Sequence, residues 1–294
     1  MKKYLTLGEL LVDYRKENNQ SQLDLASILD VDIRSVQRWE KDETLIKPEK
    51  ENELVAATLL PYQLIRNLNA SRPIPTFYDF RIRKYALTKL NNELPDANWL
   101  KDRMGDISNR IRTILPDQDS DFLKSDLKFQ KFDQKPISLS VLTKAIEILP
   151  ELNLIILDHF SNYSGHCIVL PITMEAFERL KKQEIQGSDL EIDDLSHYKA
   201  SEKPIFFNYS ITADSNDNVF YLAHSYLSFF EEKSGNDYIF CSATMRYDSY
   251  KLNEDLGLEL EWELDIKKDN LGNEYHPRFY TGNFDGYFSD KTDH

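Results

Sequence analysis

Apolar residues recur with helical spacing along the first 68 residues of the chain. The apolar face of a first helix consists of Leu7, Leu10, Leu11 and Tyr14, at i, i+3, i+4 and i+7. Ser21 and Asp32 are favourable N-cap residues, so helices are expected to begin after each of them, the later one covering Ile33–Lys41. A further helix should follow Pro48 and break at Pro61, because proline removes a backbone donor. Residues 1–69 are therefore predicted to form an all-α domain.

The pattern changes in the middle of the chain. Residues 70–135 open with the proline- and aromatic-rich stretch SRPIPTFYDF and continue with two polar segments, Asp79–Glu93 and Asn98–Leu115, that are predicted to be helices. Contact with phosphate, dimerisation and a plain solvated surface all remain open for the basic residues of this region, Arg81, Arg83, Lys84, Arg103, Arg110 and Arg112. We expect a helical connector over 70–135.

From residue 136 onward, short apolar runs alternate with amphipathic segments. Helices are predicted at Ile137–Leu149, Met174–Gln186, Val219–Glu231 and Ser249–Leu256, and strands at Leu154–Phe160, Gly165–Ile172, Ile205–Thr212, Tyr238–Thr244 and Leu258–Ile266. This order with short connections indicates an α+β or mixed-sheet domain over 136–294. The whole chain is expected to be multidomain, with an all-α part followed by a mixed α/β part.

Composition places the chain among globular proteins that do not cross a membrane. It has 294 residues, 41% of them hydrophobic, with 16 Phe, 16 Tyr and 3 Trp. No run approaches the roughly 20 apolar residues that span a bilayer, and Glu9 and Asp13 interrupt what would be the apolar core of a secretion signal. We expect a cytoplasmic protein. Its two cysteines, Cys167 and Cys241, form no Cys-x-x-Cys pair and are expected to be core residues.

The negative charge is concentrated in the C-terminal half. The formal net charge is −14, which at first argues against nucleic acid as a partner. Residues 1–69 hold 10 basic and 12 acidic residues, residues 70–135 hold 13 and 10, and residues 136–294 hold 13 and 28. The N-terminal part is therefore nearly neutral, and a DNA-binding module there stays open.

A family resemblance becomes specific in the string SQLDLASILDVDIRSVQRWEKDE, which begins at Ser21. Two short helices separated by a tight link form a helix-turn-helix, whose second helix enters the major groove of DNA. The string resembles the Cro/repressor (XRE) type, with a glutamine opening the first of these helices, Leu-Ala in its middle, an apolar residue in the turn and Val-x-x-Trp-Glu closing the other. Ala26 would let the two helices cross closely.

The outward residues of the segment that follows Asp32 are the candidate base readers. Arginine and glutamine offer donors suited to guanine and adenine edges. The DNA-binding set is Gln22, Ile33, Arg34, Ser35, Gln37 and Arg38, in which Gln22 resembles the family position that contacts a backbone phosphate. The competing interpretation is a solvated helix face in which Arg38 pairs with Asp42.

The C-terminal half resembles the GNAT acetyltransferases in the order of its elements and in the passage YKLNEDLGLELEWEL. It departs from them at the junction FFNYSITADSNDNVFYLAHS, which begins at Phe206. A working GNAT enzyme has a glycine-rich turn with a basic residue there, because bare backbone amides must approach the coenzyme A pyrophosphate. Here no glycine and no basic residue occurs, and Asp214 and Asp217 would repel the pyrophosphate. We therefore expect no enzyme activity and no cofactor. Should acetyl transfer occur, Tyr250 would be the first general acid to test.

No other motif predicts chemistry. His159 and His166 fall on neighbouring predicted strands, but no third ligand accompanies them, so no metal site is expected. The alternate carboxylates of Leu258–Leu264 match a solvated strand face. For the aromatic run EYHPRFYTGNFDGYF, packing on the sheet as a last strand is preferred over lining a pocket or joining a dimer interface.

Together these patterns predict a DNA-binding transcriptional regulator. Its partners would be double-stranded DNA, a second copy of the chain and an unidentified small-molecule effector, with a non-catalytic C-terminal domain for sensing or dimerisation. Two alternatives stay open: an acetyltransferase fused to a DNA-binding domain, and a helix-turn-helix protein that serves protein association in phage defence. The sequence decides neither the operator nor the sign of regulation.

Overall fold

The computed structural model describes residues 1–87, 109–119, 136–158, 160–232, 237–268 and 274–289. The chain divides into two compact units: residues 1–91 with 214–216, and residues 92–213 with 217–294. In the described part no helix is both long and apolar enough to span a bilayer.

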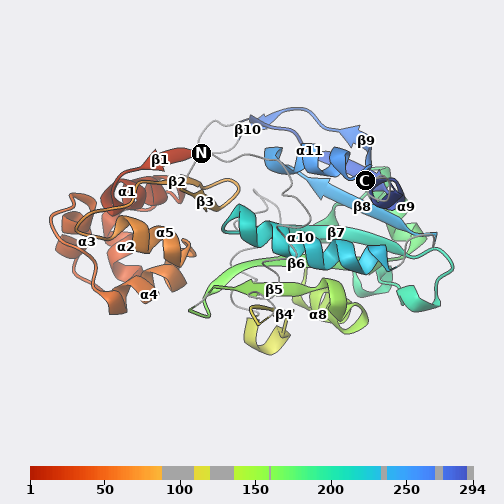
Figure 1. Ribbon diagram of the computed structural model, residues 1–294, viewed down its shortest axis with the longest axis horizontal. Helices are drawn as coiled ribbons and strands as arrows, with labels where there is room; N and C mark the ends of the chain where they lie inside the picture. The colour runs from red at the N-terminus through yellow and green to blue at the C-terminus, as the bar shows by residue number, and fades with distance from the viewer. Residues whose placement is uncertain (88–108, 120–135, 159, 233–236, 269–273, 290–294) are drawn as a thin grey trace. The chain divides into compact units, whose positions relative to one another are not determined.

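The N-terminal unit is built on five helices (Figure 1). They are α1 (Leu7–Glu17), α2 (Gln22–Ile28), α3 (Ile33–Glu40), α4 (Pro48–Thr58) and α5 (Tyr62–Leu68). Both predicted caps are confirmed: the side chain of Ser21 accepts from the Asp24 N–H in a capping box, and that of Asp32 accepts from the Arg34 N–H. The predicted break at Pro61 is also confirmed, with Leu59 in the left-handed region just before it.

The core of this unit joins all five helices. Leu10, Leu11, Leu25, Val36, Leu54 and Leu64 are fully buried within it. Ala26 is buried as the close helix crossing requires. Gly8 has a similar role in α1, because a Cβ at this position would lie 2.7 Å from the carbonyl oxygens of both Trp39 and Glu40. The start of α1 therefore packs directly against the end of α3.

Residues 116–119 of the predicted helical connector are helical, but the connector is wrong over residues 76–86. A three-stranded antiparallel sheet of order β1-β2-β3 stands there instead, formed by β1 (Lys2–Tyr4), β2 (Thr76–Asp79) and β3 (Lys84–Ala86). β2 alternates buried and half-buried residues, a period of two, and its pairing with β1 joins residues more than 70 positions apart, which helical spacing does not reveal. The second predicted helix fails likewise, because Ile111–Thr113 forms β4, while residues 98–108 lie outside the described residues.

A seven-stranded sheet forms the C-terminal unit, in the order β4-β5-β6-β7-β8-β12-β9. Its further strands are β5 (Leu154–Leu157), β6 (Tyr163–Ile172), β7 (Ile205–Ala213), β8 (Ile239–Thr244), β9 (Glu259–Glu263) and β12 (Arg278–Gly282), and a small ladder joins β10 (Lys267–Lys268) to β11 (Glu274–Tyr275). The helices are α8 (Leu139–Ile148), α9 (Met174–Lys181), α10 (Asn216–Glu231), α11 (Tyr247–Asp255) and α12 (Asp285–Ser289). Each helix and strand predicted from residue 136 onward is found, with shifted ends.

The sheet separates two hydrophobic cores. One contains residues of α10 and α11 and centres on Phe230, whose ring packs against those of Phe206, Tyr226, Phe229, Tyr238, Phe240 and Phe284. The other contains residues of α8 and α9, with Phe177 and Phe207. Cys167 and Cys241 are buried in these cores as predicted, and burial raises the pKa of the Cys167 thiol to about 12.

The C-terminal aromatic run supplies an interior strand. β12 lies between β8 and β9 and is antiparallel to both, so packing on the sheet is confirmed for this run. Only one neighbouring pair in the large sheet, β7 with β8, is parallel. That parallel pair lies at the centre of the sheet, where the second candidate site is found.

Candidate functional site

Two regions of the molecule gather polar groups suited to binding, one on α2 and α3 and one between β7 and β8. In the first, a short turn separates the helices, and Asp30 in this turn adopts the left-handed conformation. Arg34 and Arg38 on α3 are exposed, while Val36 between them is fully buried. The helix therefore presents its cations to solvent and its valine to the core.

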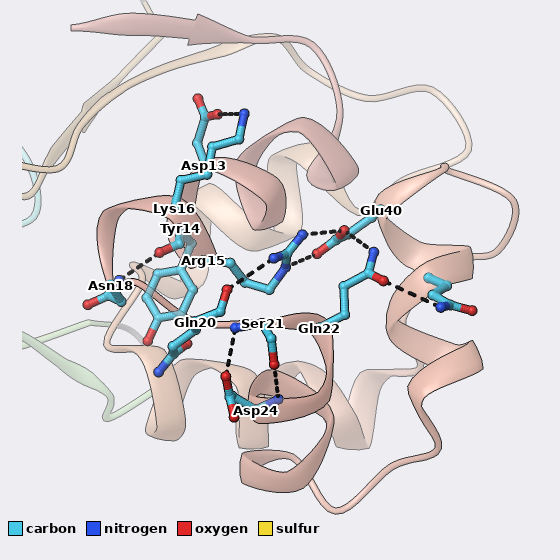
Figure 2. Close-up of polar contacts among 11 residues, drawn as sticks. Asp13, Tyr14, Arg15, Lys16, Asn18, Gln20, Ser21, Gln22, Asp24 and Glu40 are labelled. Carbon is cyan, nitrogen blue, oxygen red and sulfur yellow. Dashed lines mark hydrogen bonds and ion pairs between the residues drawn. The ribbon is translucent and has the colours of Figure 1, made fainter.

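An ion pair joins α1 to the end of α3 and orients the glutamines beside it (Figure 2). Arg15 donates through Nε to one Glu40 oxygen and through Nη2 to the other, at 2.8 Å for the latter. Gln22 donates to the same Glu40 carboxylate at 2.7 Å, and its own carbonyl oxygen accepts from the Gln37 amide at 3.4 Å. The hydrogen bond from Arg15 to Glu40 raises the pKa of Arg15. Both helices thus hold their glutamines in fixed directions.

The six residues predicted to contact DNA differ in how far they are exposed to solvent. Arg34 and Arg38 are the exposed members, and Arg38 lies 3.9 Å from Glu43 rather than pairing with Asp42, which accepts from the Gly8 N–H. Half-buried positions are held by Gln22, Ile33, Ser35 and Gln37. Ile33 packs against the core, so its side chain is less available than expected. Sequence analysis missed Arg15 and Glu40, since 25 residues separate them and no local spacing links them.

The second region is a separation of the parallel strands β7 and β8. Their pairing runs from Ile205 with Ile239 to Asn208 with Ser242 and then stops, although β7 continues to Ala213. At that point β7 carries a bulge, because Ser210 and Asn208 pair with consecutive residues of β6 and Tyr209 is the additional residue between them. In the described part of the chain, β7 therefore continues to Ala213 beyond the last residue that pairs with β8.

Polar side chains lie where the two strands separate. Asn208 donates to the Ser242 hydroxyl at 3.3 Å, while its Oδ1 atom is buried without a hydrogen-bond partner among the described residues. On the bulge, the Tyr209 hydroxyl accepts from the Ile137 N–H at 3.1 Å, and burial raises the pKa of Tyr209 to about 12. Tyr209 thus anchors the bulge, and the Asn208 oxygen is a buried acceptor beside the point at which the two strands separate.

The strand-to-helix junction lies where the sequence placed it, but its electrostatics differ. β7 ends at Ala213 and α10 begins at Asn216, with no glycine between them. Arg246, from the connection between β8 and α11, donates to the Thr212 hydroxyl at 2.9 Å. Its other nitrogens bind the Asp248 carboxylate at 3.0 and 3.1 Å. A cation therefore stands beside the end of β7, although the junction's own sequence lacks one.

The remaining candidates of the sequence have structural partners. Tyr250 donates its hydroxyl to the His276 carbonyl oxygen at 2.6 Å and accepts from the His276 N–H at 3.2 Å. Buried His166 contacts the Tyr163 hydroxyl at 2.5 Å and the Ser210 hydroxyl at 3.0 Å. His159 lies outside the described residues. In the part that is described, no three His, Cys, Asp or Glu side chains are grouped as a metal site.

Comparisons with known proteins give structural likenesses only. No family model matches the chain, and no curated protein matches it. A mutant of agmatine N-acetyltransferase in its apo form is similar at 10% identity and a TM-score of 0.40, over 59% of this chain and 98% of that one. The mosquito arylalkylamine N-acetyltransferase like 5b is similar at 13% identity and a TM-score of 0.38, over 59% of this chain and 98% of that one. The C-terminal condensation domain of Ebony, in complex with β-alanyl-dopamine, is similar at 10% identity and a TM-score of 0.37, over 59% of this chain and 97% of that one.

These likenesses bear on one prediction. Each of the three structures matches about 60% of this chain, and the likeness concerns the fold alone. Many of the similar structures are N-acetyltransferases, a finding that contradicts the prediction that the chain is not an enzyme. At these identities and TM-scores, the likenesses assign no substrate and no catalytic residue to this chain.

Proposed function

We propose that the C-terminal unit transfers an acyl group from an acyl-coenzyme A thioester to an amine, and that the N-terminal unit directs this activity to DNA. The single observation that carries the first part is the separation of β7 and β8 at the Tyr209 bulge. It leaves a strand edge inside the sheet, where an extended ligand with amide groups can hydrogen-bond as an added strand. The pantetheine arm of coenzyme A is such a ligand.

The polar groups of this region fit that arm. The Oδ1 of Asn208, which has no hydrogen-bond partner among the described residues, would accept from an amide N–H, so binding would satisfy a buried polar atom that otherwise costs stability. Arg246 lies beside the end of β7, where its charge is paired with that of Asp248. In this proposal the small-molecule effector expected from the sequence is the acyl-coenzyme A itself.

A thiol-release assay tests the transferase. The full chain is incubated with acetyl-coenzyme A and a panel of primary amines, and free coenzyme A is measured with a thiol reagent. Asn208→Ala should raise the KM for acetyl-coenzyme A, with Asn283→Ala, an exposed asparagine of the same unit, as the control. An identical KM in Asn208→Ala would disprove the role of this residue, and the absence of thiol release with every amine would overturn the proposed activity.

DNA binding is the second function, and a different observation favours it. Arg34 and Arg38 protrude from α3 while the Arg15–Glu40 pair fixes the glutamines of both helices. Arginine suits the O6 and N7 acceptors of guanine, and a fixed glutamine suits adenine. Arg34→Ala and Arg38→Ala should each lose about 1–3 kcal/mol of specific binding.

The DNA test uses a site selected from a random pool. Binding is measured at two salt concentrations, with Lys16→Ala, an exposed cation of α1, as the matched control. Unchanged affinity in the Arg34→Ala, Arg38→Ala double variant would refute the base-reading role. If the chain retained no DNA at low salt, protein association in phage defence would be the better account.

We further propose that the DNA-bound form is a homodimer. One α3 covers only a half-site, and two half-sites are usually read about one helical turn apart. Sedimentation equilibrium should show two chains on the selected site. A single chain on DNA would refute this.

A further inference from the structure

His276, in the connection between β11 and β12, is held in place at its backbone and at its ring. The Tyr250 hydroxyl of α11 bonds both the carbonyl oxygen and the N–H of this residue, at 2.6 and 3.2 Å. The imidazole Nδ1 lies 2.9 Å from a Glu263 carboxylate oxygen on β9. Three elements of the fold therefore fix the direction of one imidazole ring.

Glu263 is itself fixed. Its second oxygen accepts from Arg278 Nε at 2.8 Å, and the Arg278 guanidinium stacks 4.2 Å from the centre of the Tyr250 ring. The hydrogen bond from His276 and the nearby Arg278 lower the pKa of Glu263, so the carboxylate is charged at neutral pH. A charged carboxylate at Nδ1 favours the tautomer with the proton on that nitrogen. Nε2 is then a proton acceptor on a ring that is about one third exposed.

The strand register places His276 at the end of the sheet at which β7 and β8 separate, and β8 lies between β12 and β7. Arg278, two residues after His276, pairs with Thr244 at the end of β8. The pairing of β8 with β7 has already ended at Ser242. His276 comes two residues before β12 and therefore lies beyond the last residue of β8. This is the end of the sheet at which β7 and β8 separate.

We propose that, in the acyl transfer proposed above, His276 accepts the proton that the acceptor amine loses, with Glu263 as its positioning residue. The amine nitrogen bonds to the thioester carbonyl carbon, the carbon–sulfur bond breaks, and the thiolate leaves with the electron pair. Nε2 of His276 takes the proton from nitrogen and releases it to water, and the thiolate takes a proton from water. An imidazole oriented by a carboxylate is suited to this transfer.

Charged and titratable groups surround the ring on each element packed against it. They are Glu263 on β9, Arg278 on β12, Tyr250 and Glu254 on α11, and the Glu274–Lys268 pair on β11 and β10. Arg278 compensates Glu263, so the cluster is not a single patch of negative charge. The pH dependence of the reaction should therefore follow the imidazole.

The experiment compares His276→Gln and Glu263→Gln with His197→Gln, an exposed histidine of the same unit. All are assayed by thiol release across pH, with calorimetric binding of acetyl-coenzyme A as the check on folding. His276→Gln should lower kcat by about 100-fold or more and lose the acid limb of the pH profile, while binding stays unchanged. Glu263→Gln should lower kcat less, and His197→Gln should do nothing.

A readout without turnover separates the two roles. Long-range ¹H–¹⁵N NMR should find His276 protonated at Nδ1 in the wild type and shifted toward Nε2 protonation in Glu263→Gln. Full activity and an unchanged acid limb in His276→Gln would overturn this inference and leave the proposed function standing. An unaltered tautomer in Glu263→Gln would overturn the positioning role. A wild-type chain that transfers no acyl group would instead overturn the proposed function, and the inference with it.

Discussion

The two units build their candidate sites from contacts of different range. In the N-terminal unit, the exposed arginines sit on one eight-residue helix, and a single longer link, Arg15 to Glu40, orients what lies beside them. In the C-terminal unit, the strand separation needs β6, β7 and β8 together, and β12, which inserts between β8 and β9, brings His276 to the same end of the sheet. The candidate site on α2 and α3 therefore depends on local sequence, whereas the candidate site between β7 and β8 depends on sheet topology.

The largest expected effect is a loss of stability that is confined to the C-terminal unit. Phe230→Ala removes a fully buried ring that contacts six other rings and should lower the unfolding free energy of this unit by about 3–5 kcal/mol. Both cysteines are buried in this unit, and burial raises the pKa of Cys241 as it does that of Cys167. Labelling of the two thiols in urea therefore reports the unfolding of the unit. Phe160→Ala, at a phenylalanine that is 65% exposed, is the control. Equal labelling midpoints in the two variants would contradict the assigned core.

A smaller effect separates stability from recognition within the helical unit. Arg15→Ala leaves the Glu40 carboxylate, 4% exposed, with Gln22 but without its cation, and should cost about 3 kcal/mol. Arg38→Ala removes only an exposed pair with Glu43 and should cost less than about 1 kcal/mol of stability while weakening DNA binding. Urea unfolding followed by circular dichroism measures both. Comparable losses in the two variants would mean that Arg15 does not hold the helices together.

The smallest effect concerns pH. The hydrogen bond from Lys181 lowers the pKa of Glu261 below its ordinary 4.5, and Thr281 adds to this. A depressed folded-state pKa contributes stability above the unfolded value and loses it as pH falls through the folded one. Lys181→Met should therefore cost less than about 1 kcal/mol at pH 7, and this loss should shrink below pH 4.5. Lys182→Met, beside it and more exposed, is the control. A loss independent of pH would show that Lys181 acts otherwise.

Local pattern predicted most of the elements and missed what distant residues decide. Caps at Ser21 and Asp32, the break at Pro61 and the helices and strands from residue 136 follow from short-range spacing. β3 was mistaken for helix and β2 for part of an irregular stretch, because β2 pairs with the chain's first strand and β3 pairs with β2. The strand-to-helix junction was read as lacking a cation because Arg246 arrives from another connection, 34 residues away from Thr212.

The candidate residues divide in the same way. Arg34 and Arg38 were found from one helix face, whereas Ile33 was placed too far outward because helical spacing alone does not show how the core curves around its first turn. Glu263 lies on β9 and His276 in the connection before β12, and the two meet only because β9 and β12 pair, so no sequence spacing joins them. Tyr209 carries no mark in the sequence, since a bulge depends on the register of the neighbouring strand.

Calorimetric titration of the full chain with acetyl-coenzyme A measures directly whether the separated strands accept an acyl-coenzyme A. We expect saturable heat with one site per chain, and an affinity that is weakened in Asn208→Ala and unchanged in Asn283→Ala. Absence of saturable heat, or equal affinity in Asn208→Ala and the wild type, would contradict it.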